Sequence, residues 1–195
     1  MSPVSPGGAR RVSGFLFLVA WFGPAACSGY VEPTVRVDRS SFVRTVGNAE
    51  ADRLEAALAD VLERGADVFA QPPPLDILLV AVPPGERDAL LGGLSYGGVS
   101  RVGHRAVVEV HPASLAGVRS LNDDELRSFL GHELIHGYQC GRGPCDPQPP
   151  GLWQREIEAL EWELKEMTPG VRPPYREETR KNLEMYRELL ADPLS

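Results

Sequence analysis

His132-Glu133-Leu134-Ile135-His136 is the most informative segment of the chain, and it holds two of the four histidines. On a helix, side chains four positions apart share one face, so both imidazoles can reach the same metal ion. Glu133, between them, leans over the coordination position that remains. The spacing therefore predicts a zinc site on a helix, with Glu133 placed as general base toward a zinc-bound water.

The residues around this motif predict a helix over residues 122–139. Asn122 can cap its N-terminus, Glu125 occupies the capping-box position, and acidic residues crowd its first turn. Uncharged residues flank the histidines and give the motif apolar support: Phe129, Leu130, Leu134 and Ile135. This pattern favours metal binding over two ordinary surface histidines.

A catalytic zinc takes three protein ligands and leaves one position for water. Cys140 follows His136 at the same spacing, but ligands at i, i+4 and i+8 rise about 12 Å along one line and do not converge. The helix expected at residues 152–167 supplies acids instead: Glu156, Glu158, Glu161 and Glu163. At about 100° per residue, Glu156 lies roughly 60° from the centre of that helix's apolar stripe and Glu158 about 140°. Glu156 is therefore the favoured third ligand, and Glu158 is the alternative.

Residues 156–159, Glu-Ile-Glu-Ala, resemble the Glu-x-x-Ala segment of the gluzincins, the thermolysin-like metallopeptidases whose second motif provides a zinc-binding glutamate. The resemblance covers roughly residues 122–164. It implies a zinc-dependent peptidase in which His132, His136 and Glu156 bind Zn²⁺, acting on a peptide or protein substrate. In size the chain is similar to the compact minigluzincins, which have one small sheet and a few helices.

Two other positions refine this assignment. The metzincin arrangement is excluded, because Gln139 and Arg142 stand where it requires glycine and histidine. Many gluzincins place an aspartate four residues after the ligand glutamate, where it orients a zinc-bound histidine, and here that residue is Leu160. Another acceptor, such as a backbone carbonyl, must therefore hold the histidine ring.

The remaining segments predict a single compact α+β domain of zincin-like architecture, with a small sheet packed on the motif helix, the glutamate helix and flanking helices. Apolar spacing predicts helices over residues 48–64, before the stop signal Gly65, and 175–190. Short apolar runs predict strands over residues 75–82 and 105–111, and residues 34–37 are expected to be a brief strand or simply extended chain. We expect residues 28–47 to be a tether and first extended segment, and residues 48–195 to be the metallopeptidase domain.

The stretch from residue 92 to residue 103 holds five glycines and predicts a loop, either a flexible rim of the site or a simple turn. In zinc peptidases of the resembled plan, an exposed strand near the metal can hold a peptide by backbone pairing. Residues 106–111 are the candidate for that strand.

Other side chains are weaker candidates for the site. His104 and His111 can stabilise an oxyanion, although an ordinary surface or strand-end role is favoured for both. Three tyrosines are candidate electrophilic donors: Tyr96, Tyr138 and Tyr175. Of these, Tyr138 is expected only to pack.

Residues 1–27 indicate an export signal, with Arg10 and Arg11 followed by an apolar run over residues 15–22 that is too short to span a membrane. The small residues before Cys27 resemble a bacterial lipobox, in which that cysteine is lipidated and anchors the protein to the membrane. Pro24 stands where a lipobox prefers leucine, and ordinary signal-peptide cleavage is the alternative. Either route predicts an exported protein of the cell envelope.

Charge and cysteine content agree with an exported protein that does not bind nucleic acid. The net charge is −7, and without residues 1–27 it is −9, because 18 of the 20 basic residues then face 27 acidic ones. No basic stripe for nucleic acid is present in the sequence. Cys140 and Cys145 are separated by the turn-forming Gly-Arg-Gly-Pro, so a disulfide between them is favoured over two free thiols.

Two other hypotheses stay open beside the peptidase. In the first, the protein is an exported lipoprotein that binds zinc for structure or sensing and hydrolyses nothing. A structural site needs four protein ligands and no base, whereas the sequence offers three ligands and a glutamate in the base position. In the second, the peptidase is latent because residues 141–151 or the C-terminal helix cover its cleft.

Overall fold

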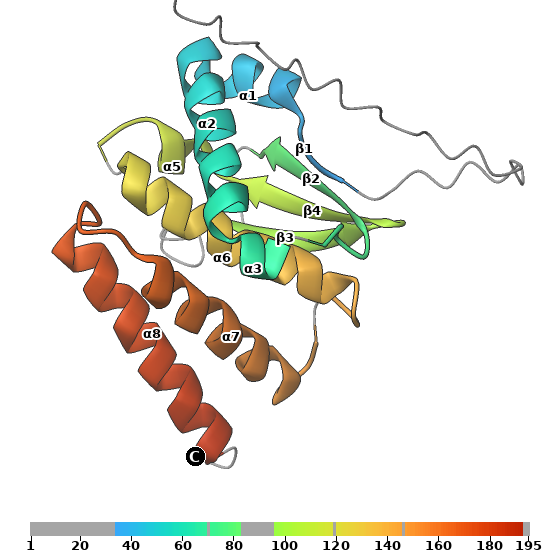
Figure 1. Cartoon of the computed structure of the whole chain (residues 1–195), viewed down its shortest axis with the longest axis vertical. Helices are drawn as coiled ribbons and strands as arrows, with labels where there is room; N and C mark the ends of the chain where they lie inside the picture. The colour runs from blue at the N-terminus through green and yellow to red at the C-terminus, as the bar shows by residue number, and fades with distance from the viewer. Residues whose placement is uncertain (1–33, 70, 83–95, 119, 146, 193–195) are drawn as a thin grey trace, which may run out of the picture. The chain divides into compact units, whose positions relative to one another are not determined.

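Four short strands form one sheet in the order β1-β2-β4-β3 (Figure 1). The computed structural model describes residues 34–69, 71–82, 96–118, 120–145 and 147–192. Its strands are β1 (Val35–Val37), β2 (Asp76–Ala81), β3 (Gly97–Val102) and β4 (Arg105–Val110). β1, β2 and β4 run parallel, and β3 pairs antiparallel with β4 across a turn at Gly103, whose φ of 60° favours glycine. The predicted export signal, including Cys27, lies outside the described residues.

One face of this sheet is apolar and buried. Successive side chains of a strand point to opposite faces, so every second residue of a half-buried strand faces the core. Ile77 and Leu79 of β2 are buried together with Ala106, Val108 and Val110 of β4, while the residues between them are partly exposed. The helix that carries the histidine motif packs on this face.

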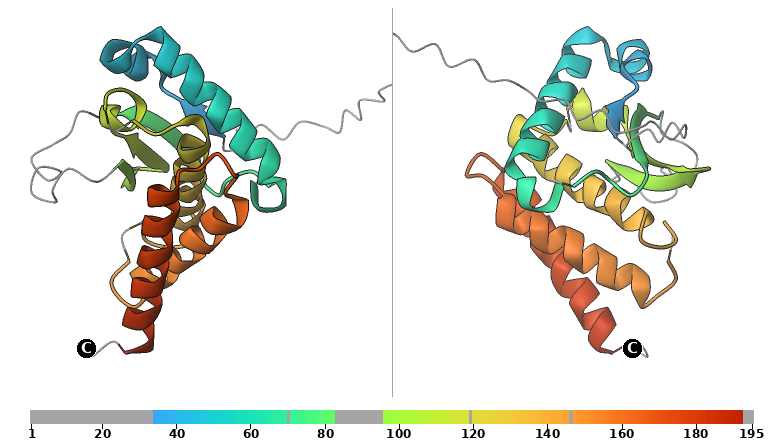
Figure 2. Two further views of the ribbon diagram at one scale, coloured as in Figure 1. Left: turned by 90° about the vertical axis from the view of Figure 1, so that its left-hand side faces the viewer. Right: turned by 45° about the vertical axis from the view of Figure 1, so that its right-hand side comes forward.

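α6 (Asp123–Cys140) carries the motif and lies between the sheet and α7 (Gly151–Glu166), as Figures 1 and 2 show. The predicted capping box starts it: the Asn122 side chain accepts from the Glu125 backbone N–H at 2.9 Å, and the Glu125 carboxylate accepts from the Asn122 N–H at 3.0 Å. Both of these interactions satisfy N–H groups that helix geometry leaves without a partner.

Two glycines let α6 approach its neighbours on both sides. A Cβ added at Gly137 would lie 3.0 Å from Ile77 Cδ1 in the sheet, and one added at Gly131 would collide with the Trp162 ring of α7. The helix is therefore held in a narrow space, and the two histidines at its centre have little freedom to shift.

The other described helices complete two further layers. They are α1 (Arg39–Val46), α2 (Asn48–Arg64), α3 (Ala66–Phe69), α5 (Pro112–Leu115) and α8 (Pro173–Ala191). α2 packs along α6 above the sheet, whereas α8 packs on α7 through a separate small core of Ile157, Leu160 and Leu183. No helix among the described residues is both long enough and apolar enough to cross a membrane.

The α+β class, the single compact domain and most of the expected elements are confirmed. α2 has the predicted bounds, and the helices expected at residues 152–167 and 175–190 begin one or two residues earlier than predicted. The first extended segment expected within residues 28–47 is present as β1, whereas the helix α1 that follows it was not predicted. β1 pairs with β2, and Phe42 of α1 is fully buried in the core, so both elements belong to the domain.

The glycine-rich stretch also differs from its prediction, because its second half forms β3 rather than a loop. A Cβ at Gly97 would collide with the Glu109 carbonyl oxygen of β4, so glycine permits this pairing rather than preventing it. β4 then lies between β2 and β3 with both edges paired. Residues 106–111 therefore cannot hold a peptide by backbone pairing, and among the described strands β3 is the edge strand on this side of the sheet.

Candidate metal centre

Three side chains from two helices converge at one point. His132 and His136 lie on successive turns of α6, and Glu156 lies on α7. The two Nε2 atoms are 3.0 Å apart, and the Glu156 carboxylate lies 3.6 Å from His132 Nε2 and 3.5 Å from His136 Nε2. The ligand atoms all lie within 4.8 Å of one another, so this group can hold a metal ion.

The far side of each imidazole contacts an acceptor that fixes its tautomer. His132 Nδ1 lies 3.1 Å from Glu163 Oε2, and an ionised carboxylate only accepts hydrogen bonds. His136 Nδ1 lies 2.8 Å from Gln139 Oε1, an amide oxygen that likewise only accepts. Both rings therefore donate from Nδ1 and, when neutral, present the lone pair of Nε2 toward each other and toward Glu156.

The orientation of the Gln139 amide is itself fixed by α7. Its Nε2 donates to the Arg155 carbonyl oxygen at 3.3 Å and to Glu158 Oε2 at 2.9 Å. Turning the amide round would bring its oxygen against these two acceptors. Glu158 thus supports the ring of His136 through Gln139, and it lies outside the group that converges on the metal position.

Two lone pairs and a carboxylate that face one another can bind one cation between them. Burial lowers the pKa of His132, but hydrogen bonds to Glu156 and Glu163 outweigh burial and hold this pKa well above its usual range. Burial raises the pKa of Glu156, but hydrogen bonds from the two imidazoles hold it well below its usual range. A proton shared by these groups and a metal ion would therefore compete for the same ligand atoms.

Glu163 is the acceptor that holds the His132 ring. It lies one turn beyond Leu160 on α7, and its carboxylate, rather than a backbone carbonyl, holds His132. Its other oxygen accepts from the Tyr175 hydroxyl of α8 at 2.8 Å, and only 3% of the residue is exposed. Burial and the neighbouring Glu163 raise the pKa of Tyr175 well above its usual range, so this hydroxyl stays protonated and donates. Glu163 lies seven positions after Glu156, which is the same face of a helix two turns later, and this spacing was the signal in the sequence.

Glu133 lies where two cavities meet beside the convergent group. The first, which we call the α8 pocket, has a volume of about 180 Å³ and is lined by Tyr96, Phe129, Leu160, Tyr175 and Glu178. The second, the loop cleft, has a volume of about 820 Å³ and is lined by residues 97–101 of β3, Pro144, Cys145 and Arg155. His132 and Glu133 line both. Burial raises the pKa of Glu133, which makes its carboxylate a stronger proton acceptor.

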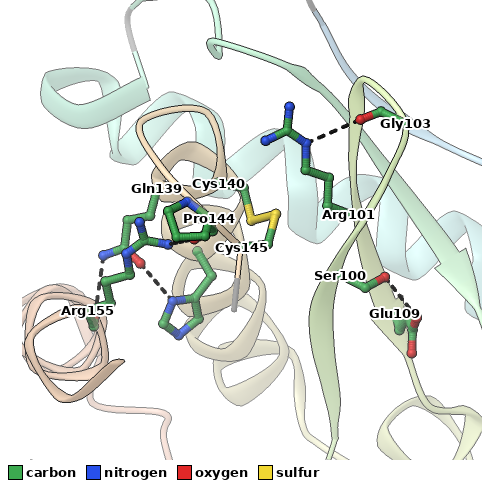
Figure 3. The surroundings of a disulfide bond; sticks show 10 residues. Ser100, Arg101, Gly103, Glu109, Gln139, Cys140, Pro144, Cys145 and Arg155 are labelled. Carbon is green, nitrogen blue, oxygen red and sulfur yellow. Dashed lines mark hydrogen bonds between the residues drawn. A yellow bond between two sulfur atoms is a disulfide. The ribbon is translucent and has the colours of Figure 1, made fainter. Parts of the chain in front are cut away.

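The predicted disulfide between Cys140 and Cys145 is present (Figure 3). It joins the last residue of α6 to the loop that follows and so sets the wall of the loop cleft opposite β3. In Figure 3, Arg155 reaches this loop from α7, and its Nη1 donates to the Pro144 carbonyl oxygen at 2.5 Å. One covalent bond and one hydrogen bond therefore hold the loop next to the metal position.

The weaker candidates lie in different places. His104 is exposed in the turn between β3 and β4, and His111 is buried at the start of α5, so neither joins the convergent group. Tyr138 packs on Phe69 in the core, as predicted. Tyr96 and Tyr175 both line the α8 pocket, with ring centroids 6.2 Å apart.

Comparisons of the chain with protein-family models, with curated proteins and with solved structures find no match. The interpretation of the site therefore comes from its motif and its geometry. These two agree on the same three residues, since the group that the coordinates bring together is the one that the sequence favoured.

Proposed function

We propose that the protein is a zinc-dependent peptidase of the gluzincin type, in which His132, His136 and Glu156 hold the ion and Glu133 is the general base. One observation carries this proposal. Two imidazoles, each held at Nδ1 by an acceptor, present Nε2 toward one carboxylate. Two histidines and one glutamate are a ligand set of catalytic zinc sites, which keep the fourth position for water or substrate.

The residues around the site suit hydrolysis of an amide bond. Zinc, when bound, lowers the pKa of water toward about 7 and polarises a substrate carbonyl. Glu133, at the junction of the two cavities, accepts the proton of that water and passes it to the departing amine. Glu163 and Gln139 keep the two imidazoles in the tautomer that binds metal.

β3 supports a peptide as the substrate. It is an edge strand of the sheet, and residues 97–101 line the loop cleft beside Glu133. An extended peptide can add to such an edge through main-chain hydrogen bonds, which bind the chain irrespective of its side chains. This would place a backbone carbonyl of the peptide next to the metal position.

The alternative is an exported lipoprotein that binds zinc without hydrolysis. A structural zinc site needs four protein ligands, and among the described residues the convergent group has three. Glu133 stands in the base position and lines both cavities, which a structural site does not require. These two observations favour the peptidase.

For localisation we propose an exported protein of the cell envelope, anchored by a lipid on Cys27 or released by ordinary signal cleavage. The Cys140–Cys145 disulfide supports export, because such bonds persist in oxidising compartments. A lipid on Cys27 would be the protein's contact with the membrane.

Elemental analysis and a peptide assay test the function together. We expect one zinc per chain in the native protein and in Glu133→Gln, and loss of zinc in Glu156→Ala. Hydrolysis of unstructured peptides should fall by about 10²- to 10⁴-fold in Glu133→Gln, because the metal remains but the base is gone. Zinc bound at full occupancy with no hydrolysis by the native protein would favour the non-hydrolytic alternative. Equal zinc content in Glu156→Ala would remove the proposed ligand set.

A further inference from the structure

The two cavities that meet at Glu133 differ in charge, because only the loop cleft is lined by basic side chains. The α8 pocket is lined by Glu133, Glu163 and Glu178 and by no lysine or arginine. The loop cleft is lined by Arg101 and Arg155 in addition to Glu133 and Glu156, the two carboxylates that belong to the metal centre. A substrate that extends across the metal position therefore meets acidic side chains at one end and basic side chains at the other.

Glu178 is the acid of the α8 pocket that has no other task in the site. Glu163 holds His132 and Tyr175, and Glu133 is the proposed base. Glu178 lies one turn after Tyr175 on α8, is exposed at the pocket, and forms no ion pair with another residue in the described part of the chain. Its charge is thus available to a ligand.

The walls of the α8 pocket suit a long cationic side chain. Phe129 and Leu160 are apolar, and the rings of Tyr96 and Tyr175 stand together on one side. The methylenes of lysine or arginine pack on such surfaces while the charged end reaches a carboxylate or lies over an aromatic face. An acidic side chain would be repelled here and would lose its hydration without gaining a partner.

The loop cleft disfavours the same cation. Arg155 is fixed there by the Pro144 carbonyl oxygen, and Arg101, exposed on β3, donates from Nε to the Gly103 carbonyl oxygen at 3.2 Å. Neither guanidinium forms an ion pair with a described residue, so both leave positive charge at this end. A cationic side chain is therefore directed away from the loop cleft and into the α8 pocket.

Strand pairing defines which substrate residue reaches the pocket. β3 runs from Gly97, which lines both cavities, to Arg101, which lines only the loop cleft. A peptide that pairs antiparallel with β3, the more stable arrangement per residue, runs in the opposite direction. The residue that follows the scissile bond then enters the α8 pocket.

We propose that the α8 pocket selects lysine or arginine directly after the scissile bond, with Glu178 as the residue that recognises the cation. This inference rests on the proposed peptidase function. It defines the substrate class as peptides with a basic residue on the amine side of the cleaved bond.

Matched peptides test the proposal in the zinc-loaded protein. Unstructured peptides that differ only in having lysine, leucine or glutamate after one bond are compared by kcat/KM, with cleavage positions read by mass spectrometry. We expect lysine above leucine above glutamate. Glu178→Gln should lower the lysine-to-leucine ratio by about tenfold, and Glu178→Lys should place glutamate above lysine. Glu177→Gln is the control, because Glu177 pairs with Lys181 and does not line the pocket.

Binding of the same peptides to Glu133→Gln, followed by fluorescence anisotropy, separates this inference from the function. Hydrolysis without a charge preference, a ratio unchanged in Glu178→Gln, or cleavage after rather than before lysine would overturn the inference and leave the peptidase. Preferential binding of the lysine peptide without hydrolysis by the native protein would overturn the peptidase and support the pocket. Neither hydrolysis nor selective binding would overturn both.

Discussion

Two groups of buried carboxylates lie on or against α6, and the protein compensates their charges in different ways. Glu125, in the first turn, is fully buried, and its oxygens accept from the Asn122 N–H and from the backbone N–H, Nε and Nη2 of Arg172. Two turns later, Glu133, Glu156 and Glu163 surround the two histidines. Within the described residues, no lysine or arginine pairs with any of these three.

The difference distinguishes a carboxylate that is neutralised within the protein from a group of carboxylates that could bind a metal ion. A buried charge is tolerated when the protein supplies both a counter-charge and hydrogen bonds, as it does for Glu125. The second group has more hydrogen-bond acceptors than donors, and only the two histidines can balance its negative charge. A chain that leaves several acceptors facing one point without a cation of its own provides a place for a cation from solution.

Loss of the internal counter-charge at Glu125 should have the largest effect on stability. Arg172→Ala leaves this carboxylate buried with only backbone and helix-end donors, and we expect a loss of about 3 kcal/mol of unfolding free energy. Urea denaturation measures it. Zinc affinity should not change, because Arg172 lies at the other end of α6 from His136.

Arg187→Ala is the control for Arg172→Ala. Arg187 pairs with Glu161 on the same two-helix unit, and both side chains are more than half exposed. Arg187→Ala should cost between about 0 and 1 kcal/mol. Equal losses in Arg172→Ala and Arg187→Ala would mean that Glu125 does not need its counter-charge, and the contrast between the two groups would fail.

Changes in the second group should affect zinc affinity more than they affect the free energy of unfolding. Glu163→Gln keeps a side chain of the same size but weakens the acceptor that holds His132, so we expect zinc affinity to fall by about 10- to 100-fold. The metal-free protein should lose less stability than Arg172→Ala does, since removing one of three neighbouring carboxylates lowers their mutual repulsion and offsets part of the weakened hydrogen bond to His132. Competition with a coloured chelator gives the affinity, and denaturation of the metal-free protein gives the stability.

Glu161→Gln is the control for this change on the same helix. Glu161 is half exposed and contacts Arg187, so its neutralisation should leave zinc affinity unchanged. An affinity in Glu163→Gln that equals that of the native protein would show that the Glu163–His132 contact does not tune the metal. Glu163 would then belong with Glu125 as a structural carboxylate.

The sequence predicted the parts of this site that depend on helix periodicity. The i, i+4 spacing placed His132 and His136 together, and the angle around the second helix chose Glu156 over Glu158. The capping box at Asn122 was also predicted, because it depends on residues three positions apart. All of these are short-range relations, which the geometry of a single helix determines.

Long-range relations were the ones that the sequence did not predict. β3 was missed because glycine is depleted in strands, yet at Gly97 the absence of a side chain is what allows β4 to approach. The same error made residues 106–111 appear as an exposed strand. The partnership of Glu163 with Tyr175 joins α7 to α8, and that of Glu125 with Arg172 spans 47 residues. Neither follows from the spacing of residues along one helix.

The smallest of the expected effects tests the cap that begins α6. Asn122→Ala removes the acceptor for the Glu125 N–H, and we expect a loss of about 1 kcal/mol of unfolding free energy.

Asn122 also donates from Nδ2 to the Gly170 carbonyl oxygen at 3.0 Å, so part of the loss can arise from that contact. Asn122→Asp separates the two, because aspartate retains the cap but cannot donate to Gly170. Near-native stability in the aspartate variant assigns the loss to the cap, whereas equal losses in both variants would assign it to the Gly170 contact. In either variant zinc affinity should stay at the native value, because Asn122 caps the N-terminus of α6, whereas His132 and His136 lie further along the helix.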